Sequence, residues 1–183
     1  EIRYFTSSGN FSYTSATGQT IDVVVVGGGG GGGDRGGGGG GGGGVVYYPS
    51  LPLAAYTGST TIPITVGSGG SGYSNGSGDN GGQAGGTSKF GSSSQPSIYL
   101  MALGGGGGLS DNRNSRNDNP DTAPSPAHGR GGSGGGQHEC TGTMNTDANG
   151  TQTTDPNIPA NSRTYGYGNP GGRANPGLSL IHI

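Results

Sequence analysis

The residue types best suited to chemistry stand together once in this sequence, at His138-Glu139-Cys140. Imidazole, carboxylate and thiolate groups all bind metals, but a closed zinc site needs four ligands at characteristic spacings. Cys140 is the only cysteine, and no histidine follows it at a suitable distance. An exposed polar loop accounts for the triplet more simply, so we predict no metal site.

Other acidic and nucleophilic residues also form no recognisable site. Asp111, Asp118 and Asp121 lie near one another, but they lack the alternating spacing and the closing glutamate of a calcium loop. The sequence pairs no nucleophile with a base. We therefore predict that the protein is not an enzyme and uses no cofactor.

Glycine-rich phosphate-binding loops are a further alternative. G-x-G-x-x-G occurs repeatedly in the glycine runs 27–33 and 36–44, after valines at 23–26 that mimic the strand of a dinucleotide site. Such a site requires a helix after the glycines, with its N-terminus facing the pyrophosphate. Here more valines follow, and Lys89, the only lysine, belongs to no Gly-Lys-Ser/Thr loop. We predict neither a Rossmann site nor a P-loop.

Charge and hydrophobicity exclude two further classes of partner. The formal net charge is −2, and the eight basic residues are scattered, so no basic stripe could follow a nucleic-acid backbone. No apolar run approaches the ~18 residues that a membrane-spanning helix needs. We expect neither nucleic-acid binding nor membrane insertion.

The two glycine runs are the elements around which the chain is organised. Glycine contributes 48 residues, and hydrophobic residues only 26%, too few for a conventional core. Linkers are usually diluted with serine, whereas these runs are pure and bounded by valines. We predict polyglycine-II helices with three residues per turn, so that nine glycines reach roughly 28 Å. Their backbone groups must pair with neighbouring segments; the alternative is a disordered low-complexity segment.

Short strands are predicted outside the glycine runs. Alternating apolar residues mark the first ones, at Ile2 and Tyr4 and at Phe11 and Tyr13, and three more cover residues 21–26, 60–66 and 98–103. The four valines predict a strand covered on both faces, and Pro63 predicts an edge position. Turns are expected at 8–10 and 16–19, and Asp34-Arg35 is expected to join two antiparallel glycine segments.

The predicted fold class is all-β with polyglycine-II helices. Short strands and stacked glycine-rich segments form a layered slab, and long irregular loops connect them, at 47–52, 109–128 and 138–163. A single glycine-rich domain is expected over residues 1–177, incomplete at both ends. Residues 178–183, LSLIHI, match a translated transposase end sequence of the kind used in sequencing adapters. The chain is therefore expected to be a metagenomic fragment.

Several segments together resemble a known family. Strand 21–26 entering the glycines, then TTIPITVGSGG at 60–70, GTSKFG at 86–91 and ALGGGGG at 102–108, are similar to the glycine-rich domain of phage tail-fibre and related virion or surface proteins. The resemblance covers roughly residues 5–172. The design is also similar to that of the tip adhesin of T-even phage tail fibres, in which glycine-rich motifs stack and loops between them contact the host.

The resemblance implies a structural, host-receptor-binding domain located in a virion tail fibre or on an extracellular surface. Its expected partners are a bacterial cell-surface protein or glycan and another tail-fibre protein. The expected receptor contacts are loop residues, because tyrosine, serine and asparagine are typical of adaptable binding loops. The candidates are Tyr47, Tyr48, Tyr56, Tyr73, Asn112, Arg113, Asn114 and Arg116. The alternative function is a non-enzymatic secreted or cell-surface structural protein, including an ice-binding type.

Overall fold

The computed structural model describes residues 1–14, 18–33, 37–53, 61–72, 81–96, 98–109, 131–136, 150–153 and 159–171. These residues contain the following elements: β1 (Gly9–Ser12), β2 (Thr20–Val26), β3 (Val45–Pro52), β4 (Thr61–Thr65), β5 (Ser88–Phe90), β6 (Leu100–Ala102), α1 (Ala160–Thr164) and β7 (Gly166–Tyr167).

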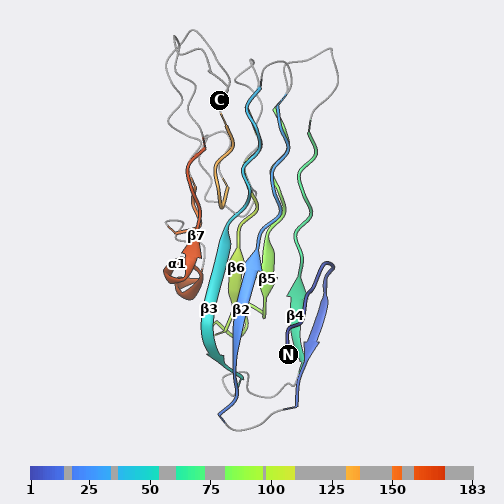
Figure 1. Ribbon diagram of the computed structural model, residues 1–183, viewed down its shortest axis with the longest axis vertical. Helices are drawn as coiled ribbons and strands as arrows, with labels where there is room; N and C mark the ends of the chain where they lie inside the picture. Colours follow the sequence, from blue (N-terminus) through green and yellow to red (C-terminus); the bar gives the residue numbers. More distant parts are fainter. Residues whose placement is uncertain are drawn as a thin grey trace.

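The strands form two antiparallel sheets, with the orders β1-β4-β5-β6 and β2-β3-β7. Strand β2 lies against β5 and β6, and β3 lies against β6, so the sheets pack face to face (Figure 1). The predicted all-β class is confirmed. Helix α1 was not predicted; it is the one α-helix in the part of the chain that the structure describes.

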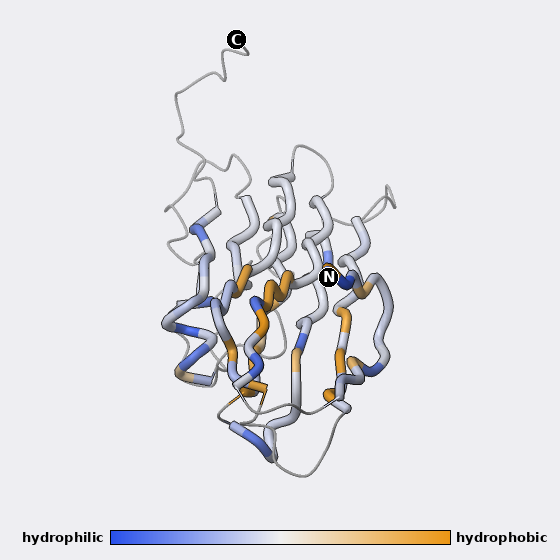
Figure 2. Tube along the Cα trace, turned by 60° about the horizontal axis from the view of Figure 1, so that its bottom comes forward, coloured by the Kyte–Doolittle hydropathy of each residue, from blue (hydrophilic) through white to orange (hydrophobic). Residues whose placement is uncertain are grey.

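A small apolar core fills the space between the sheets. Its buried members are Val23, Val25, Val46, Leu51, Leu53, Ile62, Phe90, Ile98, Leu100 and Ala102. Figure 2 shows the apolar residues in the strand half, whereas the glycine half is almost uniformly pale. The scarce hydrophobic residues are therefore concentrated where strands pack, and the other half must be held together differently.

Each sheet strand that leads towards the glycine half continues into a glycine-rich segment (Figure 1). We number six of these segments I (27–33), II (37–44), III (67–72), IV (81–86), V (104–109) and VI (131–136); residues 168–171, which follow β7, add a further short segment beside segment VI. Segments I and V follow β2 and β6, and segment II leads into β3. The strands therefore fix the position and direction of the segments.

Backbone hydrogen bonds between the segments recur at every third residue. Gly27, Gly30 and Gly33 of segment I donate to the carbonyls of segment II at 2.7–3.0 Å. Segment II donates in the same way to segment V, and segment IV to segments III and V. The spacing matches the three residues per turn of a polyglycine-II helix. The helical conformation itself stays a prediction.

The pairings arrange the segments as two rows. Segments III, I and II follow one another in one row, and segments IV, V and VI in the other. Hydrogen bonds join neighbouring segments within each row, and further hydrogen bonds join the two rows. This is the predicted layered slab. Segments I and II run antiparallel, as expected if residues 34 and 35 form the turn, although these two lie outside the described residues.

Glycine is required at most positions of segments I and II because the backbones approach closely. A Cβ at Gly30 would collide with the carbonyl oxygen of Gly106, and one at Gly41 with that of Ser133. At Gly39 and Gly42, by contrast, a Cβ would meet nothing within 4 Å. The slab therefore excludes side chains from its interior and leaves single rows of glycines open at its surface.

Strand β2 corrects the prediction that its valines are covered on both faces. Val23 and Val25 are each 7% exposed, whereas Val24 and Val26 are 61% and 53% exposed. The strand that is buried throughout is β6. A run of apolar residues does not distinguish a central strand from an outer one, because only the packing of the sheets decides which face is covered.

Strand β3 corrects the prediction of a loop over residues 47–52. The Tyr47 N–H donates to the Tyr165 carbonyl, just before β7, at 3.0 Å. Backbone groups two residues apart in a strand point the same way, so the nitrogen of Pro49 also faces the β7 side. Strand β7 pairs only with Val45 and Val46 and does not reach that far. Proline is tolerated there because no ladder partner requires its N–H.

The structure also corrects three assignments in sheet β1-β4-β5-β6. Gly9 and Asn10, predicted as a turn, begin β1, whereas Ile2 and Tyr4 belong to no strand. The pairing of β1 with β4 overrides the local turn signal. Pro63 lies in an interior strand rather than at an edge. It is tolerated there because it lies beyond the last β4–β5 pair, opposite Gly91, whose N–H donates to its carbonyl.

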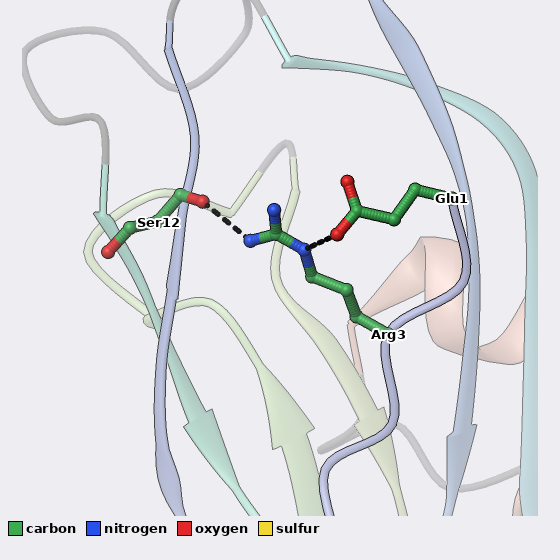
Figure 3. Close-up of polar contacts among 3 residues, drawn as sticks. All are labelled: Glu1, Arg3 and Ser12. Atoms are coloured by element: carbon green, nitrogen blue, oxygen red, sulfur yellow. Dashed lines mark hydrogen bonds and ion pairs between the residues drawn. The ribbon is translucent and has the colours of Figure 1, made fainter.

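One arginine ties the start of the chain to β1 (Figure 3). Arg3 donates from Nε to a Glu1 carboxylate oxygen at 2.8 Å and from Nη1 to the Ser12 carbonyl at 3.1 Å. Its guanidinium lies over the Phe11 ring, 5.5 Å from the centroid. The hydrogen bond from Arg3 lowers the pKa of Glu1. Because the ion pair is exposed, it orients the segment more than it stabilises the fold.

The outer edge of β6 is closed by side chains rather than by another strand. Gln152, which is fully buried, accepts the Leu103 N–H at 2.7 Å and donates to the Met101 carbonyl at 2.9 Å. The Ser162 hydroxyl accepts the Met101 N–H at 2.8 Å. The amide of Gln152 thus takes the place of a peptide group of a neighbouring strand.

We expect Gln152→Ala to lower the free energy of unfolding by about 1–3 kcal/mol, because it leaves buried backbone groups without partners. Urea unfolding measures the change. The matched control is Gln83→Ala, whose side chain is exposed and whose loss should change stability by less than about 0.5 kcal/mol. Equal stabilities of the two variants would contradict this role of Gln152.

A second pair of variants tests the close approach of the glycine segments. Gly30→Ala should cost about 1–3 kcal/mol or more, because the added methyl group collides with the backbone at Gly106. Gly42→Ala should be neutral or stabilise by up to about 1 kcal/mol, since alanine restricts the unfolded chain. Thermal unfolding of both variants provides the comparison, and a Gly42→Ala variant as unstable as Gly30→Ala would be the contradictory result.

Candidate functional site: an exposed tyrosine and valine face

The outer face of sheet β2-β3-β7 carries large apolar side chains in contact with solvent. Val24, Val26, Tyr47 and Tyr167 are 61%, 53%, 40% and 63% exposed. Val24 pairs with Tyr47, and Val45 pairs with both Val26 and Tyr167. Residues paired across antiparallel strands lie on the same face, so the exposed side chains form one surface. We call Val24, Val26, Tyr47 and Tyr167 the tyrosine–valine face.

A β-bulge positions a carboxylate beside this face. Between the pairs Val23–Tyr48 and Ile21–Leu51, strand β3 holds one residue more than β2. Ser50 takes the left-handed conformation there, with φ of 53°, and its N–H donates to Asp22 Oδ1 at 2.8 Å. A residue other than glycine rarely adopts this conformation without local support, so one function of Asp22 is to hold the bulge.

The second oxygen of the same carboxylate orients a tyrosine. The Tyr47 hydroxyl donates to Asp22 Oδ2 at 3.3 Å. The negative charge of Asp22 is the main cause that raises the pKa of Tyr47; partial desolvation, this hydrogen bond and the nearby Tyr167 raise it further. Each carboxylate oxygen has about two acceptor positions, so both oxygens retain capacity for a ligand.

The two adjacent tyrosines predicted as contacts point to opposite faces of β3. Tyr47 faces solvent, whereas Tyr48 is half-buried against the core and lies 4.5 Å from the Tyr165 ring, centroid to centroid. Successive side chains alternate across a strand, so a strand exposes only one of them. The remaining contact candidates lie outside the described residues: Tyr56, Tyr73, Asn112, Arg113, Asn114 and Arg116.

Four members of the site, Asp22, Val24, Val26 and Tyr167, were not among the predicted contacts. A signal for three of them is present in the sequence, because residues 22, 24 and 26 alternate along β2 and must share a face. Tyr167 is one of the tyrosines of the glycine-rich sequence, but only its pairing in β7 brings it beside β3.

The described residues present no cluster of side chains typical of a metal site. No group of three or more His, Cys, Asp or Glu side chains in them is placed to hold a metal ion. The triplet at 138–140 and the aspartates at 111, 118 and 121 lie outside those residues. Within the same part of the chain, no helix is long and apolar enough to cross a membrane. The predicted absence of enzyme activity stays a prediction.

Comparison with known families matches residues 6–179 to the glycine-rich domain family. The chain belongs to this family. The match covers both sheets and all six glycine segments, so the resemblance noted from the sequence is confirmed at the level of the glycine-rich domain. Comparisons with curated proteins and with solved structures gave no match.

Replacing the carboxylate tests the electrostatic link within the face. In Asp22→Asn the pKa of Tyr47 should fall towards its ordinary value, because the negative charge that disfavours the phenolate is removed. In the native domain the raised pKa adds stability at neutral pH, which is lost as the pH rises through the titration of Tyr47. Tyrosine ¹³C NMR titration measures the shift, and an unchanged Tyr47 titration would contradict the assignment.

Proposed function

We propose that this glycine-rich domain is an adhesin-like, host-receptor-binding domain of a phage tail fibre or a related virion or cell-surface protein. The observation that carries the proposal is the tyrosine–valine face. A chain with few hydrophobic residues leaves four large apolar side chains in solvent on one sheet. Contiguous exposed apolar surface of this kind marks interaction sites more often than chance positions.

The glycine slab supports the proposal through its rigidity. We propose that its segments are polyglycine-II helices, consistent with the three-residue spacing of their hydrogen bonds. Segments without side chains offer little for recognition, but they hold strands β2 and β3 in fixed positions. A preorganised surface loses less conformational entropy on binding. The slab is thus the support, and side chains at its strand end and in its loops are the contacts.

The proposed partners follow from this division between a supporting slab and contacting side chains. The receptor is a protein or glycan of the bacterial surface, and another tail-fibre protein would carry the domain. Tyrosine contributes large contact area with few rotatable bonds. Several copies on one particle would convert weak individual contacts into strong attachment. A location on a virion or an extracellular surface is part of the same proposal.

The double variant Tyr47→Ala/Tyr167→Ala tests the proposed contacts. Labelled domain should bind susceptible bacteria at least about tenfold more weakly than the native domain, since aromatic anchors dominate interface energies. The matched control is Tyr4→Ala, an exposed tyrosine outside this sheet, which should bind normally. Undiminished binding by a folded double variant would show that these tyrosines are not the contacts.

A further inference from the structure

We propose that the tyrosine–valine face binds a neutral bacterial glycan, whose sugar rings stack on Tyr47 and Tyr167 and whose hydroxyls donate to the Asp22 carboxylate. This inference rests on the proposed function and names the receptor's chemical class.

The chemistry of the face suits an amphipathic ligand. Sugar rings present C–H groups on one side and hydroxyls around the rim. Aromatic faces carry partial negative charge, so they attract polarised C–H groups, and the valines extend the apolar area. Asp22 lies at the border of this area, within hydrogen-bonding distance of the Tyr47 hydroxyl. A carboxylate accepts stronger hydrogen bonds than a neutral group, and sugar hydroxyls are abundant donors.

The charge of the face favours a neutral ligand. Asp22 is the only Asp, Glu, Lys or Arg in strands β2, β3 and β7. Phosphorylated or acidic sugars would meet a negative charge with no arginine or lysine of these strands to pair with them, and such approach of like charges is costly. A neutral chain avoids this repulsion and still uses the carboxylate as an acceptor.

The size of the face favours a glycan over a folded protein. With exposures of 40–63%, the four side chains offer on the order of 300 Å² of apolar surface. A standard protein interface buries about 800 Å² from each partner, of which roughly 450 Å² is apolar, more than this face offers. The available area instead corresponds to a few sugar rings lying flat on the sheet.

The first test uses the full chain on host cells treated in two ways. Periodate, which opens sugar rings, should abolish binding, whether or not protease treatment also reduces it. Binding that survives periodate would overturn the glycan inference; if protease then abolished it, receptor binding as such would stand. Failure to bind any untreated cell would remove the proposed function and this inference with it.

The second test uses neutral polysaccharide released from the same cells as the probe. The native chain should bind it, Tyr47→Phe should retain most of the affinity because its ring still stacks, and Tyr47→Ala should lose at least tenfold. Asp22→Asn should weaken binding several-fold, and Tyr4→Ala should have no effect. No binding of the polysaccharide, or equal loss in Tyr47→Phe and Tyr47→Ala, would overturn the proposed stacking.

Discussion

The hydrogen bonds between glycine backbones are the interaction on which the rest of this structure depends. They form only because the segments approach so closely that a single Cβ at Gly30 or Gly41 would collide with a neighbouring carbonyl. This exclusion explains the composition, since half of the molecule cannot use side chains for packing. It also explains why the segments need neighbours on several sides: an extended segment without internal hydrogen bonds leaves its peptide groups to be satisfied by others.

The small apolar core and the glycine slab depend on each other. The core fixes the direction and spacing of the strands, and the strands deliver the glycine segments to one another in register. Glycine loses the most conformational freedom on folding, so segments anchored at one end by packed strands lose less than free segments would. Gln152 contributes at the junction, because it completes the edge of β6 where that strand passes into segment V.

The tyrosine–valine face follows from the same architecture. Strands β2 and β3 form an outer layer, so one set of their alternating side chains must face solvent, and the bulge at Ser50 brings the Asp22 carboxylate to the border of that set. A single carboxylate thereby holds the backbone of the bulge and orients Tyr47. Strands β2 and β3 carry the candidate site and also continue into segments I and II of the slab, which holds the exposed rings in position.

The sequence by itself determined the class of the fold: runs of pure glycine bounded by valines require backbone pairing, and short alternating segments require strands. It also identified Tyr47 as a candidate contact. Only the tertiary structure decided that Tyr48 turns inward, that Val24 and Val26 are exposed, that residues 47–52 continue a strand, and that Tyr167 lies beside β3. The physical reason is that local patterns specify which residues can form a strand, whereas the face that is covered depends on which sheet the strand joins and what packs against it.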